Sequence, residues 1–163
     1  MILANALLEL QAAARPEAIP VNPIARWTWV FPVVETLHVL GFTLLVGTAV
    51  VLDLRLLGWR LQQQPVSRIA KDLAPWIWTG IVVQLTTGPY LFSGDPFEYV
   101  QVNAFRVKMA LLLVALIFHF TAIRAATSPA RDTQPLGWRR PAALVSIALW
   151  FSVLLGGMWI GNL

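Results

Sequence analysis

Apolar stretches long enough to cross a bilayer make up most of this chain, and short polar segments separate them. No charged residue occurs between Asp72 and Asp95, and none occurs between Pro141 and Leu163. As helices, both stretches could cross the roughly 30 Å apolar core of a membrane. With two further apolar segments, the pattern predicts spans at about 27–57, 73–93, 103–126 and 141–161. We therefore expect an all-α integral membrane protein built as a four-helix bundle.

Residues 1–26 precede the first predicted span and have a different character. Apolar residues recur at helical spacing from Ile2 to Ala14, but this stretch is too short to cross a membrane. Its first basic residue, Arg15, follows the apolar residues, whereas a secretory signal would carry basic residues before them. Several prolines then interrupt helical continuity. We expect a short interfacial helix here, within a single transmembrane domain that covers residues 1–163.

Composition supports a membrane location and excludes several other classes. The chain is 58% hydrophobic and only 12% charged, whereas soluble domains are roughly 25% charged. It contains no cysteine, which excludes disulfides, thiolate metal ligands and iron–sulfur clusters. The net charge of +4 comes from residues in short loops, so we expect the lipid bilayer as partner and no nucleic acid.

Basic residues in the loops predict the orientation of the spans. Two connections are rich in them, with Arg55, Arg60, Arg68 and Lys71 around the first and Arg124, Arg131, Arg139 and Arg140 around the third. The positive-inside rule places both connections on the cytoplasmic side. The chain is then expected to be N-out and C-out in a bacterial inner membrane. Glycines within the spans would let helices approach closely; they are Gly41, Gly47, Gly80, Gly88, Gly156 and Gly157.

The first span carries the candidate functional residues in the run Trp29-x-x-Pro32-x-x-Glu35-x-x-His38. Glu35 and His38 are three positions apart and therefore share a helix face. Ionisable groups within hydrocarbon are costly, so they mark a candidate site. The third span places Arg106 and Lys108 at about the same depth, where either could pair with Glu35.

The second span adds Gln84, Thr87 and Tyr90 at this level. The outer half of the bundle is thus expected to gather an acid, an imidazole, cations and hydrogen-bonding groups. A buried ion pair that fixes helix register, with a histidine bonded to the backbone, is the structural interpretation. The functional interpretation is a b-type haem, with His38 as axial ligand and the basic side chains toward the propionates.

His119 is the only candidate for a second histidine ligand, either of haem or of a metal. Counted from the starts of their spans, it lies several residues deeper than His38, at about 1.5 Å per residue. One haem between both histidines would therefore require an offset of the helices. A copper or zinc site from Glu35, His38 and His119 has few ligands. A di-iron site would need a second Glu-x-x-His motif, and the chain has only one.

The inner end of the first span carries a further carboxylate, Asp53. Arg124, at the inner end of the third span, is the predicted partner. We interpret the two as an ion pair at the membrane edge that anchors two helices, in preference to a proton-relay carboxylate.

The chain resembles a family of uncharacterised bacterial four-span membrane proteins over about residues 26–126. The resemblance rests on the run from Trp29 to Gly41, on Asp53-Leu-Arg-Leu-Leu-Gly58, on Thr87-Gly88 and on Asn103-x-Phe105-Arg106-x-Lys108. It implies the four-span architecture. Through His38 and Lys108 alone, the chain is also similar to four-helix membrane haem proteins, such as the protoporphyrinogen oxidase of the bacterial haem pathway and copper-resistance membrane proteins.

Three functions follow as hypotheses. The first is a b-type haem or quinone-linked electron-transfer subunit that works with other membrane or periplasmic redox subunits or as a homo-oligomer. The second is a non-redox accessory subunit that anchors a larger membrane complex. The third is a proton or metal-ion transporter that uses Glu35, His38 and Asp53.

Overall fold

In the computed structural model, the described part of the chain is helical and contains no strand. The described residues are 29–59, 63–94, 96–133 and 137–160. The interfacial helix expected within residues 1–26 lies outside them. The elements in chain order are α2 (Val30–Leu56), α3 (Val66–Phe92), α4 (Pro96–Gln101), α5 (Asn103–Phe118), the π-helical segment η2 (His119–Ile123), α6 (Arg124–Ala126), the short 3-10 turn η3 (Pro129–Arg131) and α7 (Arg139–Ile160).

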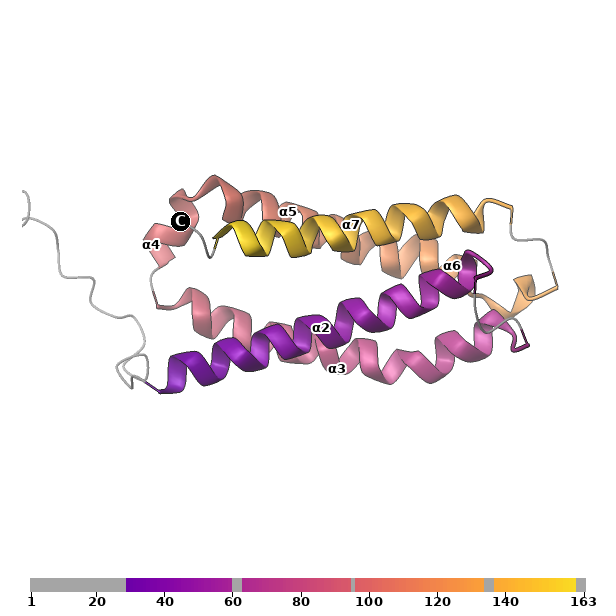
Figure 1. Ribbon diagram of the computed structural model, residues 1–163, viewed down its shortest axis with the longest axis horizontal. Helices are drawn as coiled ribbons and strands as arrows, with labels where there is room; N and C mark the ends of the chain where they lie inside the picture. The colour runs from indigo at the N-terminus through magenta and orange to yellow at the C-terminus, as the bar shows by residue number, and fades with distance from the viewer. Residues whose placement is uncertain (1–28, 60–62, 95, 134–136, 161–163) are drawn as a thin grey trace, which may run out of the picture.

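Four long helical segments, namely α2, α3, α5 with η2 and α6, and α7, run side by side along the molecule (Figure 1). Three of them are both long and apolar enough to cross a membrane: Val30–Leu56, Asn103–Ala126 and Arg139–Gly157. The fourth, α3, is equally long at 27 residues. Its first turns carry Arg68, Lys71 and Asp72, and it is not among the helices that meet both criteria. The structure thus confirms a helical protein with three candidate spans.

The helices form two pairs. α2 packs along α3, α5 packs along α7, and contacts between α2 and α7 join the pairs. Glycines allow the close approach of α2 and α3. A Cβ atom at Gly80 would lie 2.8 Å from Leu45 Cβ, and one at Gly41 would lie 2.8 Å from Val83 Cβ. Gly47 faces no atom within 4 Å, so the predicted close contact is absent there.

Buried apolar side chains form two clusters along the bundle. The first lies toward the α2–α3 connection and the second lies further along the bundle, where the fully buried Trp150 packs with Leu45. Many other large apolar side chains remain exposed, for example Leu85 at 68%. An apolar outer surface is what contact with lipid requires, because the bilayer core is itself apolar.

A side-chain contact ties the connection between α6 and α7 to the start of α3. Asp132 Oδ1 accepts a hydrogen bond from the Ser67 backbone N–H at 3.2 Å, and Asp132 Oδ2 accepts one from the Ser67 hydroxyl. The first turn of a helix has backbone N–H groups without partners inside the helix. Asp132 therefore caps α3 from a distant part of the chain.

Candidate functional site

His38 is held by Thr87 at the contact between α2 and α3. Its Nδ1 atom lies 2.8 Å from Thr87 Oγ1. The Thr87 hydroxyl donates its hydrogen to the Val83 carbonyl, at 2.6 Å. Because a hydroxyl has one hydrogen and two lone pairs, Thr87 must accept from His38, which places the ring proton on Nδ1. The lone pair of a neutral His38 ring then lies on Nε2.

Two neighbours fix the surroundings of this ring. Gln84 Nε2 donates to the His38 backbone carbonyl at 2.6 Å, which joins the two helices at the same level. A Cβ atom at Gly88 would lie 3.5 Å from His38 Cε1. Glycine therefore leaves the Cε1 side of the ring, next to Nε2, free of a side chain from position 88.

Lys108 approaches this cluster from the other helix pair. Its Nζ atom would lie 3.3 Å from a Cβ atom at Gly157, and its Cβ lies 3.5 Å from the corresponding position at Gly156. The two glycines of α7 thus accommodate the lysine side chain. Its charge is close enough to act on His38. Lys108 is half-buried and forms no hydrogen bond or ion pair with a residue of the described segments.

Glu35 and Arg106 are placed differently from the expectation. Glu35 is exposed, and Arg106 is exposed with its Nε donating to the Val100 carbonyl at 2.7 Å. Within the described segments neither forms the ion pair that was expected of Glu35 and a cation. The reason lies in helix geometry, since Arg106 and Lys108 are two residues apart and point to nearly opposite faces.

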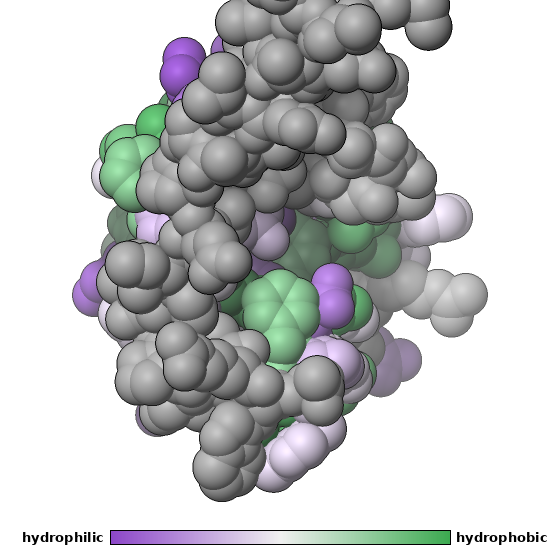
Figure 2. Space-filling view, turned by 90° about the vertical axis from the view of Figure 1, so that its left-hand side faces the viewer, coloured by the Kyte–Doolittle hydropathy of each residue, from purple (hydrophilic) through white to green (hydrophobic). Residues whose placement is uncertain are grey.

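Tyr90 lies on the same helix as Thr87, one turn nearer the end of α3. Its hydroxyl is buried and has no hydrogen-bond partner within the described segments. Figure 2 views the molecule from the end at which α2 begins and shows apolar and polar residues side by side there.

His119 belongs to a different part of the bundle. It begins η2, is buried, and contacts the Phe120 and Trp150 rings at centroid distances of 5.6 and 6.3 Å. It also lines a cavity together with Trp78 of α3. Trp78 and Thr87 are nine residues apart on α3, which is about 13 Å along a helix axis.

The two histidines therefore lie at different levels, and the structure does not bring them together. No group of three or more His, Cys, Asp or Glu side chains that could hold a metal ion occurs among the described residues. In this structure the described histidines form two separate environments, with His38 in a polar one and His119 in an aromatic one.

The predicted ion pair of Asp53 and Arg124 is not formed. Asp53 is fully buried and faces Ser146 of α7, but neither carboxylate oxygen nor the Ser146 hydroxyl has a hydrogen-bond partner of normal geometry within the described segments. Arg124 is exposed on α6. The C-terminal end of α2 packs on the start of α7, where Leu52 and Leu56 share a buried cluster with Ala142 and Ala143, and Asp53 faces α7.

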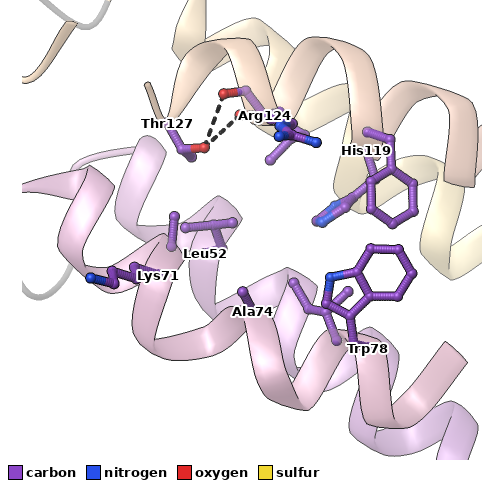
Figure 3. Close-up of a pocket in the computed structure, with 11 residues that line it drawn as sticks. Leu52, Lys71, Ala74, Trp78, His119, Arg124 and Thr127 are labelled. Carbon is purple, nitrogen blue, oxygen red and sulfur yellow. Dashed lines mark hydrogen bonds between the residues drawn. The ribbon is translucent and has the colours of Figure 1, made fainter. Parts of the chain in front are cut away.

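The cavity next to His119 has a volume of about 320 Å³. It lies between α3 on one side and η2 with α6 on the other, as Figure 3 shows. Its walls are almost wholly apolar, and Lys71, Arg124 and Thr127 lie on its rim. The sequence gives little signal for this cavity, because it depends on how the two helix pairs meet and on the π-helical segment.

Comparison with known proteins gives one match. Neither the curated proteins nor the solved structures include a protein that matches the chain. The sequence profile of a family of unknown function, DUF6644, matches residues 29–163. That range contains every described helix and both of the environments above. The chain belongs to this family, DUF6644.

Proposed function

We propose that the protein is a membrane-embedded electron-transfer subunit that holds a b-type haem through His38. The observation that carries the proposal is the fixed orientation of this ring. Histidines that ligate metals usually donate their other ring N–H to a hydrogen-bond acceptor, which sets the tautomer and the ring plane. Thr87 supplies such an acceptor to His38 Nδ1, and the lone pair on Nε2 would be the ligand.

The other residues of this cluster fit the same group. Lys108 brings a cation without an acidic partner to the neighbourhood of His38, and a propionate would satisfy it. The His38 ring packs against α3 at Gly88, where an added Cβ would lie 3.5 Å from Cε1. When bound, a b-type haem would supply one-electron chemistry, while His38 would set its position and Lys108 its orientation. A quinol hydroxyl could instead donate to His38 Nε2, so a quinone is the alternative redox group.

Separation of the histidines favours a single protein ligand. Because His119 lies about 13 Å away along the bundle in its own aromatic surroundings, the proposal assigns the axial role to His38 alone. His119 is then a side chain of the interior, and its substitution should leave the haem spectrum unchanged.

The proposal includes four spans in a bacterial inner membrane, N-out and C-out. α3 supports this because Leu73–Phe92 contains no charged residue and lies along α2, a candidate span of similar length. Reporters fused after Gln64 and Thr133 should behave as cytoplasmic, and one at the carboxy terminus as external. A cytoplasmic carboxy terminus would refute this topology.

The test of haem binding is an optical spectrum of the purified protein after reconstitution with haem. We expect a reduced b-type spectrum that His38→Ala abolishes and Lys108→Ala weakens, because only the histidine bonds the iron. His119→Ala is the matched control for loss of an imidazole. A folded wild-type protein that takes up no haem, or a spectrum equally reduced by His38→Ala and His119→Ala, would contradict the proposal.

The exposure of Glu35 favours a second function, as an accessory subunit of a larger membrane complex. A carboxylate within the second turn of α2 that faces outward would lie in or near lipid if the bundle were alone, which is costly. A second chain with a donor or cation at this position would remove that cost. We expect Glu35→Leu to change the assembly size in mild detergent, with Val39→Ala, one turn further on the same exposed face, as control. Identical masses for all variants would argue against this function.

A further inference from the structure

The cavity between α3 and η2 has the form of a slot that opens at the side of the bundle. Trp78 and Phe120 are in contact across it, with ring centroids 5.4 Å apart. Its walls include Ala74 and Ile77 of α3 and Ile123 of η2. The principal helix contacts are those within each pair and between α2 and α7, so α3 and α5 leave room for a guest between them.

One end of the slot is positively charged. Lys71 of α3 and Arg124 of α6 both line the cavity, and both are exposed. In Figure 3 the Lys71 side chain points away from the other labelled residues. Lys71 precedes Trp78 by seven residues, about 10 Å along the helix. Arg124 follows Phe120 by four residues, about 6 Å along the helix. Neither side chain forms an ion pair with a residue in the described segments. The slot thus combines a cationic mouth with an apolar interior.

The π-helical segment shapes the interior wall. Two of its residues at opposite ends, His119 and Ile123, line the slot. π-helical turns are rare and are frequently found at functional sites. Thr127, at the mouth, donates its hydroxyl hydrogen to helix carbonyls. His119 is a buried hydrogen-bonding group of the slot, and its Nδ1 makes no hydrogen bond within the described segments.

We propose that this slot binds an anionic phospholipid. Its phosphate lies between Lys71 and Arg124, and an acyl chain enters the apolar interior toward Trp78 and Phe120. Basic pockets between spans on the cytoplasmic side are suited to anionic head groups. His119 is five residues beyond Arg124 toward the membrane centre, about 7 Å deeper, where the ester groups of a lipid follow its phosphate. The imidazole can donate a hydrogen bond to an ester carbonyl there.

This site is independent of the haem proposal. It uses neither His38 nor Lys108, and it lies about 13 Å away from His38 along the bundle. The mouth lies in the cytoplasmic leaflet only if the proposed orientation is right. The combination of basic residues and an apolar slot does not depend on that orientation.

Native mass spectrometry of the full chain in detergent tests the proposal with two lipids that share the same acyl chains. Dioleoyl phosphatidylglycerol should bind more tightly than dioleoyl phosphatidylcholine. A basic residue near the surface contributes about 1 kcal/mol toward anionic lipid. The double variant Lys71→Ala/Arg124→Ala should therefore weaken phosphatidylglycerol binding about 30-fold, while Arg68→Ala/Arg140→Ala, which removes two exposed cations outside the slot, should change it little.

A second pair of variants tests the acyl-chain site without changing charge. Ala74→Leu places a larger side chain in the slot, whereas Ala125→Leu places one on an exposed position next to Arg124. We expect Ala74→Leu alone to weaken phosphatidylglycerol binding, with both proteins folded by circular dichroism. Equal affinity for the two lipids, equal effects of the two double variants, or unchanged binding in Ala74→Leu would each overturn the proposal. Tighter binding of a neutral quinone, unaffected by Lys71→Ala/Arg124→Ala, would do so too.

Discussion

The hydrogen bond between Thr87 and His38 can be measured as a coupling energy. Thr87→Val removes the acceptor of His38 Nδ1–H at 2.8 Å and also the short bond to Val83. Thr86 is the matched control, because its hydroxyl also donates to a carbonyl one turn earlier, that of Val82 at 2.9 Å. Thr86→Val therefore measures the cost of the backbone bond without the histidine.

The expected magnitude follows from the environment of the pair. Net contributions of protein hydrogen bonds are about 0.5–1.5 kcal/mol, and measured side-chain bonds between membrane helices average about 0.6 kcal/mol. His38 is half-buried, so we expect Thr87→Val to lower the free energy of unfolding by about 1 kcal/mol more than Thr86→Val. In a His38→Ala background this excess should disappear.

The measurement is reversible unfolding in mixed micelles with increasing dodecyl sulfate, followed by circular dichroism. All variants should start from the same helical content, so that unfolding free energies are comparable. An excess cost of Thr87→Val that persists in the His38→Ala background would refute the reasoning. It would show that Thr87 contributes through packing or its own backbone bond and that Thr87 does not set the tautomer of His38.

Three further predictions concern the helix contacts. Gly80→Ala should lower the free energy of unfolding by about 1–3 kcal/mol, because the added Cβ would lie 2.8 Å from Leu45 Cβ, while Gly47→Ala, in open space, should cost little; equal effects in chemical denaturation would contradict the close contact. Asp132→Ala should lower the free energy of unfolding by about 1 kcal/mol, because it removes the cap of α3. Ser67→Ala should lower it mainly when Asp132 is present, which a double-mutant cycle would measure. Asp53→Asn should preserve or raise the melting temperature, because the buried carboxylate has no hydrogen-bond partner in the described segments. The ion pair would be supported if Asp53→Asn and Arg124→Ala each lowered the melting temperature by a similar large amount and the double variant lost no more than either single variant.

The sequence alone determined where apolar helices lie and the level of most polar groups along them. Helix rise is nearly constant at 1.5 Å per residue, so counting from the span starts predicts Arg106 and Lys108 at about the depth of Glu35 and His119 several residues deeper than His38. The charge-free stretches predicted helices over 73–93 and 141–161, and the structure has α3 over Val66–Phe92 and α7 over Arg139–Ile160. α3 begins earlier because charged residues also form its first turns.

The direction in which each side chain points was decided only by tertiary structure. Rotation of a helix about its axis depends on packing, and in an apolar chain most faces look alike in sequence. The structure half-buries Lys108 against Gly156 and Gly157 of α7 and leaves Arg106 exposed. It also buries Asp53 facing Ser146 of α7, while Arg124 is exposed. The slot beside His119 likewise requires the π-helical turn and the contact between the helix pairs. Both depend on packing between distant parts of the chain, and no local sequence pattern predicts them.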